Sequence, residues 1–89
     1  MPARRIKLSG REAAVIRAID TAEGTTGQEI HDRTQIAFED LIDVVNGLID
    51  VGFLETIPPR EIVPFQDLTT TVFDTNPAYG SDLRAATRR

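Results

Sequence analysis

The chain has 89 residues, a net charge of −4 at neutral pH, no cysteine and one histidine. A chain of this length forms one compact domain, which excludes a two-domain enzyme. The missing thiols and the single imidazole exclude disulfide scaffolds, thiolate zinc sites and cysteine nucleophiles, so we expect no metal and no other cofactor.

The first helix is predicted by a capping box. Ser9 and Glu12 have the S-x-x-E spacing, in which each side chain binds the backbone amide of the other residue. An apolar stripe follows at helical spacing, formed by Val15, Ile16, Ile19 and Ala22. We expect this helix to run to Gly24, which would end it in a left-handed conformation.

A second capping box predicts a short helix after the first. Thr26 and Glu29 repeat the spacing, and we expect the helix to reach the neighbourhood of Arg33. Ile30 is its only large apolar residue, so this side chain is expected to anchor the helix in the core.

The longest periodic segment predicts a third, strongly amphipathic helix. Its large apolar residues recur at the spacing of one helical face: Phe38, Leu41, Ile42, Val45, Leu48 and Ile49. Gly52 follows at the position where a helix commonly ends in a left-handed conformation.

After Gly52 the pattern becomes that of a two-stranded hairpin. Residues 53–57 read as a strand that Pro58 ends, since proline cannot donate to a ladder, and the β-branched run 69–74 reads as its antiparallel mate. The loop between them is too apolar for a free linker, and we expect part of it to pack: Ile62, Val63, Phe65 and Leu68. A final short helix or tail is expected over residues 81–89.

This order of elements resembles the winged helix-turn-helix family of transcriptional regulators. Residues 29–34 (EIHDRT) are similar to the second helix of that family, and residues 48–54 (LIDVGFL) are similar to its turn from the third helix into the wing. The resemblance implies an α+β fold, in which a small three-helix core carries a C-terminal two-stranded β wing and a short terminal helix can follow. It divides the chain into a basic N-terminal arm (residues 1–8), a winged-helix domain (9–80) and a short helical or disordered basic tail (81–89).

In DNA-binding members of this family, the third helix enters the major groove and the wing contacts the backbone or the minor groove. Most cations of this chain lie at its ends: residues 1–11 carry a net charge of +4 and residues 84–89 carry +3, whereas residues 12–83 carry −11. The candidate DNA-binding residues are Arg4, Arg5, Lys7, Arg11, Arg33, Gln35 and Arg60. The leading hypothesis is therefore a transcription-related regulator that binds duplex DNA through its wing and basic termini.

The third helix itself favours a different partner. No lysine or arginine occurs between Arg33 and Arg60, and the expected exposed positions are Glu39, Asp40, Asp43, Asn46, Gly47 and Asp50. Because duplex DNA presents one negative charge per roughly 1.7 Å, these carboxylates oppose the usual docking mode. The alternative hypothesis is a protein-interaction module that does not bind DNA.

This alternative module would meet a basic protein surface. The residues offered to such a partner are Glu39, Asp40, Asp43, Asn46 and Asp50, or the apolar loop around Ile62, Val63 and Phe65. The acids can equally be structural, because carboxylates in a first helical turn stabilise the helix dipole. Gly47 either reflects close approach by a neighbour or is simply tolerated.

No catalytic site is predicted. His31 and Asp32 are adjacent on a helix and point to different sides, and the carboxylates of Asp40 and Asp43 show no sign of a cleft. Phosphate-binding and nucleophile-elbow motifs are absent, so we expect a non-enzymatic protein. No apolar run approaches the roughly 20 residues that span a bilayer, which predicts a cytoplasmic protein with no membrane partner. The resemblance implies a monomer or a weak homodimer, because small winged-helix regulators often pair through terminal helices, and residues 83–86 offer a small apolar contact for such pairing.

Overall fold

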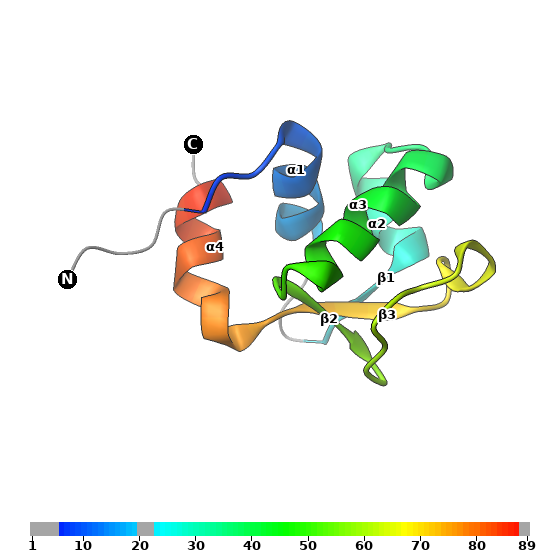
Figure 1. The fold of residues 1–89 in the computed structure, drawn as a ribbon. Coiled ribbons are helices and arrows are strands. Elements are labelled where there is room, and N and C mark those ends of the chain that lie inside the picture. Colours follow the sequence, from blue (N-terminus) through cyan, green and yellow to red (C-terminus); the bar gives the residue numbers. More distant parts are fainter. Residues whose placement is uncertain (1–5, 20–22, 88–89) are drawn as a thin grey trace.

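The computed structural model describes residues 6–19 and 23–87 (Figure 1). Within these ranges the fold is α+β, with four α-helices, two short 3-10 helices and three strands. The elements in chain order are α1 (Gly10–Ala18), β1 (Thr25–Thr26), α2 (Gly27–Thr34), α3 (Phe38–Asp50), β2 (Leu54–Ile57), η1 (Phe65–Asp67), β3 (Val72–Thr75), η2 (Pro77–Tyr79) and α4 (Gly80–Thr87). The predicted helical core, β wing and short terminal helix are all present.

The three strands form one antiparallel sheet in the order β1-β3-β2. Strand β3 is central, because Phe73 lies opposite both Thr25 of β1 and Thr56 of β2. Helices α1, α2 and α3 lie together over one side of the sheet, and α4 packs beside α1 (Figure 1). Strand β2 is therefore an edge strand of the described sheet.

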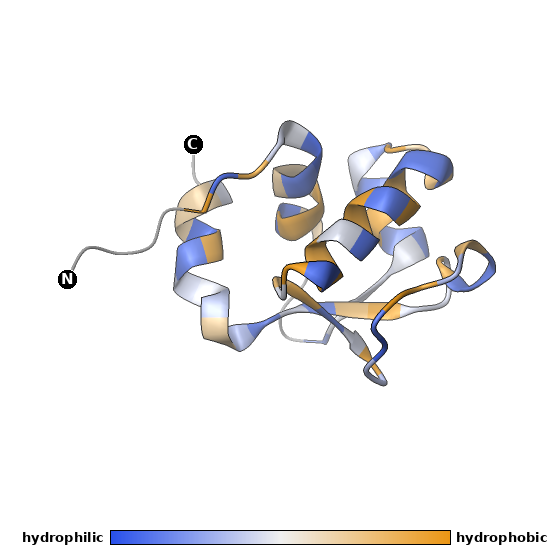
Figure 2. Cartoon of the chain, viewed as in Figure 1, coloured by the Kyte–Doolittle hydropathy of each residue, from blue (hydrophilic) through white to orange (hydrophobic). Residues whose placement is uncertain are grey.

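The core lies between the helices and the sheet. Its buried apolar residues are Val15, Ile16, Ile19, Ile30, Leu41, Val45, Leu48, Leu54, Val63, Leu68, Phe73 and Leu83. Figure 2 shows hydrophobic bands alternating with hydrophilic ones along α3, as expected for a helix with one buried face. Leu83 of α4 is only 1 % exposed. Leu83, the largest apolar side chain of the segment expected to form a dimer contact, therefore packs inside the molecule and is not available for that contact.

Both predicted capping boxes are formed. At the start of α1, the Glu12 amide donates to Oγ of Ser9 at 3.1 Å and the Ser9 amide donates to Oε1 of Glu12 at 2.7 Å. At the start of α2, the Glu29 amide donates to Oγ1 of Thr26 at 3.2 Å and the Thr26 amide donates to Oε1 of Glu29 at 2.9 Å. Each box satisfies two backbone donors that a helix start leaves open, which fixes where the two helices begin.

Helix α3 also follows the prediction. Leu41, Val45 and Leu48 are fully buried, so the apolar stripe faces the core. Gly52 has a φ of 88°, the left-handed conformation expected just after the helix.

The end of α1 differs from the prediction. The helix stops at Ala18 rather than near Gly24, and Ala22 lies outside the described residues. Gly24 does have a left-handed φ of 80°, but it leads into β1. A Cβ on Gly24 would lie 2.7 Å from Cγ1 of Val72, so the glycine permits the close approach of this segment to β3.

The second strand of the wing begins later than predicted. Strand β3 starts at Val72, because the carbonyl oxygens of Thr69 and Thr71 are used by α2. They accept hydrogen bonds from the amides of Gln28 at 3.3 Å and Gly27 at 3.1 Å. Strand β1 was not predicted, since two residues carry no periodic signal of their own and the strand exists through its pairing with β3.

The apolar loop of the wing is divided between the core and the surface. Val63 and Leu68 are each 1 % exposed, which confirms that part of the loop packs. Ile62 and Phe65 are 67 % and 55 % exposed. Of the apolar loop residues offered to a partner, Val63 is therefore unavailable, and Ile62 and Phe65 lie at the surface.

Candidate functional site

The outward side of α3 carries a row of carboxylates. Glu39, Asp43 and Asp50 are exposed, and their spacing of four and seven residues places them along one face of the helix. None of them forms an ion pair with a described residue. We call these three residues the acidic face. Gly47 lies along the same row, and a Cβ added there would meet no other residue within 4 Å.

Two residues predicted for this surface are engaged within the protein. Oδ2 of Asp40 lies 3.5 Å from Nη2 of Arg11. Asn46 is half-buried rather than exposed: its Nδ2 donates to the Val63 carbonyl oxygen at 3.0 Å, and its Oδ1 accepts from the Val63 amide at 2.8 Å. Asn46 thus fixes the wing loop to α3, which corrects the prediction of an exposed position.

The described arginines predicted to contact DNA each lie beside a carboxylate. The three pairs are Arg11–Asp40 at 3.5 Å, Arg33–Glu29 at 3.7 Å and Arg60–Asp67 at 3.0 Å. Nη1 of Arg33 also donates to the Ala18 carbonyl oxygen at 2.6 Å, which ties α2 to the end of α1. Exposed ion pairs stabilise a fold by at most about 1 kcal/mol. Each carboxylate nevertheless reduces the positive charge that a DNA phosphate would meet.

The remaining DNA-binding candidates are distributed differently. Lys7 is exposed before α1, whereas Arg4 and Arg5 lie outside the described residues. Gln35 ends α2 with a φ of 62°, and its Nε2 donates to the Asp32 carbonyl oxygen at 2.8 Å. Its side chain therefore serves the turn between α2 and α3.

The turn is also braced by His31. The imidazole ring stacks on Phe38 with ring centroids 3.9 Å apart, and its Nδ1 lies 2.7 Å from the Ile36 carbonyl oxygen. His31 therefore packs between α2 and the start of α3. It holds the start of α3, and with it the acidic face, in a fixed position relative to α2.

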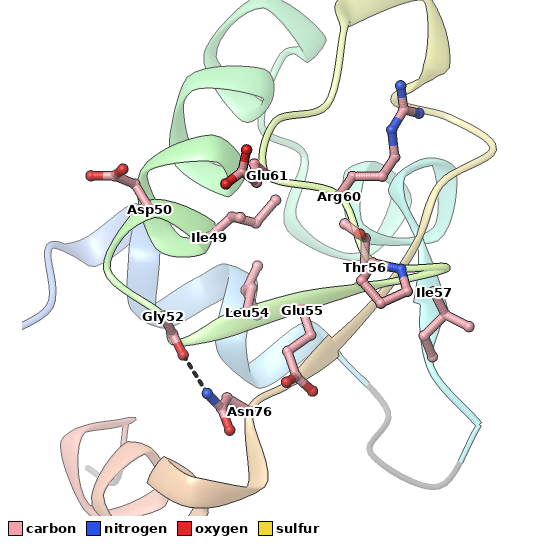
Figure 3. Close-up of a pocket in the computed structure, with 11 residues that line it drawn as sticks. Ile49, Asp50, Gly52, Leu54, Glu55, Thr56, Ile57, Arg60, Glu61 and Asn76 are labelled. Atoms are coloured by element: carbon pink, nitrogen blue, oxygen red, sulfur yellow. Dashed lines mark hydrogen bonds between the residues drawn. The ribbon is translucent and has the colours of Figure 1, made fainter.

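An open groove of about 530 Å³ lies between the end of α3 and β2 (Figure 3). Its lining consists of Ile49, Asp50, Gly52, Leu54, Glu55, Thr56, Ile57, Pro59, Arg60, Glu61 and Asn76. The side chain of Arg60 points away from the groove in Figure 3, and its guanidinium pairs with Asp67. Three of the lining residues are acids, Asp50, Glu55 and Glu61. In Figure 3 the Glu55 side chain lies on the side of β2 opposite to Leu54, and the Asp50 side chain points away from β2.

This groove was not found from the sequence. Its residues come from a helix, a strand and a loop, and their positions depend on hydrogen bonds between distant segments. Asn46 holds the loop at Val63, and Nδ2 of Asn76 donates to the Gly52 carbonyl oxygen at 2.8 Å (Figure 3). Only the exposed acids carried a sequence signal.

Two kinds of feature are absent from the described ranges, a cluster of metal ligands and a membrane-spanning helix. No group of three or more histidine, aspartate or glutamate side chains is placed to hold a metal ion. None of the described helices has the length and apolar character needed to cross a membrane.

Comparison with protein families, curated proteins and solved structures finds no match for this chain. The resemblance to winged helix-turn-helix regulators therefore stays a prediction that rests on residues 29–34 and 48–54.

Proposed function

We propose that this chain is a non-enzymatic winged-helix module that binds a basic protein surface through the acidic face of α3, in a role related to transcriptional regulation. The observation that carries the proposal is the charge of this helix. Glu39, Asp43 and Asp50 are exposed with no described cation paired to them, and α3 contains no lysine or arginine.

Electrostatic complementarity supports a basic partner rather than DNA at α3. Like charges placed opposite each other across an interface can cost several kcal/mol, whereas opposite charges guide encounter and fix the register of the partner. The C-terminal end of α3 adds to the effect, since it carries a partial negative charge near Asp50. A cationic partner gains from both features.

Duplex DNA is the competing partner. It is favoured by the order of the elements and by the net charge of +4 on residues 1–11. In that case the contacts come from the basic termini and Arg60, while α3 stays outside the major groove. Replacing Arg60 by alanine should then weaken DNA binding and flatten its salt dependence, because one phosphate contact is lost.

An amide NMR titration separates the two partners. The labelled protein is titrated in parallel with a short lysine-rich peptide and with a short non-specific duplex, first at low salt and then at physiological salt. We expect the peptide to shift the amides of α3 around Glu39, Asp43 and Asp50 at both salt concentrations. Salt-sensitive shifts from DNA at residues 36–43 and Arg60 would contradict the proposal. DNA shifts confined to residues 7–11 and 84–87 would indicate only charged ends.

A charge-reversal pair tests the surface itself. The double variant Asp43→Lys and Asp50→Lys should weaken binding of the lysine-rich peptide by about tenfold or more, because exposed ion pairs contribute about 0.2–1 kcal/mol each and reversal replaces attraction by repulsion. Glu23→Lys is the matched control, since it reverses an exposed carboxylate away from α3. The double variant changes the net charge by four units and the control changes it by two. A loss of binding free energy in the control that is half the loss in the double variant would therefore show that net charge alone, and not the acidic face, attracts the peptide.

A further inference from the structure

The wing loop lies directly against one flank of α3. The amide and the carbonyl group of Val63 are both bonded to the side chain of Asn46, at 2.8 and 3.0 Å. Asn46 lies three residues after Asp43 and four residues before Asp50, so it adjoins both of them on the helix surface. The loop at Val63 is therefore placed beside the part of the acidic face that lies between Asp43 and Asp50.

Ile62 points outward at this position. Val63 is only 1 % exposed, and it precedes Pro64, whose φ of −68° and ψ of 152° are those of an extended chain. A residue before proline is itself restricted to extended conformations, and successive side chains of an extended chain point to opposite sides. Because Val63 points into the core, Ile62 points away from it, and Ile62 is 67 % exposed. The carboxylates of the acidic face also point away from the core, so one surface carries both kinds of side chain.

The same surface has an apolar border and a bare stretch of backbone. Ile42 and Ile49 lie four residues before and three residues after Asn46, and both are half-buried. Gly47, within the acidic face, is exposed, and a Cβ added there would meet no other residue within 4 Å. A backbone position without a side chain allows another molecule to approach closely.

The spacing of the carboxylates indicates the form of the partner. Asp43 and Asp50 are seven residues apart, which corresponds to about 10.5 Å along the helix. A second helix with basic residues seven positions apart repeats this distance, whereas an extended segment places side chains of one side at multiples of about 6.6 Å. The distance between two packed helices depends on the side chains at their contact, and Gly47 brings none. A helix fits this surface better than an extended segment.

We propose that a basic, amphipathic α-helix of a partner protein packs along α3 and crosses it at Gly47. Lysine or arginine side chains seven positions apart meet Asp43 and Asp50, and an apolar side chain between them contacts Ile62. The opposite charges guide the encounter and fix the register, while the apolar contact adds affinity. The inference rests on the proposed function in one respect, which is that the partner is basic. It adds the helical form of the partner and the contact with the wing loop.

Three alanine-based peptides of equal charge test the helical partner. Each has about 20 residues, because shorter helices are marginal in water. The first carries lysines seven positions apart with two leucines between them on the same face, and the second has these leucines on the opposite face. The third replaces one alanine in the middle of the first by proline, which breaks the helix. Each peptide is titrated into the full chain, and binding is followed by amide NMR.

The first peptide is expected to bind most tightly. It should shift the amides of residues 39–50 and 61–63, and its affinity should exceed that of each other peptide about threefold to tenfold. The second peptide loses the apolar contact with Ile62, and the third loses the helical spacing of its lysines. Equal affinity of all three peptides would overturn the helical partner. If the double reversal of Asp43 and Asp50 still weakens them all in that case, the acidic face stands without it.

Variants of the chain locate the contact. Ile62→Ala should weaken binding of the first peptide about threefold to tenfold and leave the second unchanged. Ile57→Ala is the matched control, because Ile57 is 54 % exposed and alternates with the buried Thr56, so it points to the sheet face away from the helices. Gly47→Gln should also weaken the first peptide, because a side chain then occupies the place of closest approach.

The variants also define what would contradict the proposal. Unchanged binding of the first peptide by Ile62→Ala would overturn the contact with the wing loop, and unchanged binding by Gly47→Gln would overturn the crossing at Gly47. Equal losses in Ile62→Ala and Ile57→Ala would show that exposed apolar area in general, and not this surface, attracts the leucines. If none of the three peptides binds, the acidic face and the helical partner both fail.

Discussion

The start of α2 and the outer row of α3 each contain a glycine, but the first glycine is tightly packed and the second is not. A Cβ on Gly27 would overlap the carbonyl oxygen of Leu68, whereas a Cβ on Gly47 would meet no other residue within 4 Å. The first amides of α2 are also taken by the carbonyl groups of Thr69 and Thr71. The start of α2 thus packs tightly against residues 68–71 of the wing loop, whereas the outer row of α3 around Gly47 has no neighbouring residue packed against it.

Polar side chains follow the same division. Towards the wing loop, the amide of Asn46 has both its ends bonded to Val63. Along the open row, the carboxylates of Asp43 and Asp50 have no ion pair with any described residue. Buried polar groups need hydrogen-bond partners within the protein, whereas exposed polar groups can bind water or another molecule. The division therefore separates the residues that build the fold from those that can bind.

The largest effect on stability is expected where α2 packs against the wing loop. Gly27→Ala should destabilise the protein by about 3 kcal/mol, because the new methyl group must displace the backbone at Leu68. Helix propensity alone would favour alanine in a helix, so the close approach decides the sign. The free energy of unfolding in urea measures the effect. A neutral Gly27→Ala would show that residues 68–71 can move away from α2 at little cost.

An intermediate effect is expected at the link between α3 and the wing. Asn46→Ala should lower the free energy of unfolding by about 2 kcal/mol, because the amide and carbonyl groups of Val63 both lose their partner. Amide hydrogen exchange should accelerate at Val63. Asp43→Ala is the control on the open row, where a surface substitution changes stability by less than about 0.5 kcal/mol.

Asn46→Asp tests which half of this link matters. Aspartate keeps an acceptor for the Val63 amide, but it places a second acceptor against the Val63 carbonyl oxygen. It should therefore destabilise the protein without restoring the native link. Stability equal to that of the native protein would contradict the two-bond arrangement.

The sequence predicted the parts of the fold whose causes lie within a few residues. The capping boxes at Ser9 and Thr26 each join residues three positions apart, and both helices begin where these boxes predict. The predicted end of α1 and the predicted start of β3 were wrong, because both positions depend on contacts with distant segments of the chain. The threonine run 69–71 has a strand-like composition, yet its carbonyl groups are used at the start of α2.

The candidate site divides in the same way. The acidic face could be read from helical spacing, since exposure of Glu39, Asp43 and Asp50 follows from the burial of the opposite face. The groove beside β2 could not, because it needs the wing loop to be placed first. Asn46 illustrates the limit: it shares the polar pattern of α3, but its partner Val63 is 17 residues away.

The smallest change in stability is expected at Gly47 on the outer row of α3, and there we expect a gain instead of a loss. Gly47→Ala should stabilise the protein by about 0.5–1 kcal/mol, because alanine is the better helix former and the site has space for a methyl group. Urea unfolding of Gly47→Ala and Gly27→Ala in one series measures both changes in the free energy of unfolding, which should have opposite signs. Destabilisation by Gly47→Ala would mean that something packs against α3 there, and the row would no longer count as open. A gain in stability with weaker binding of the lysine-rich peptide would place the partner close to the backbone at Gly47, within the acidic face.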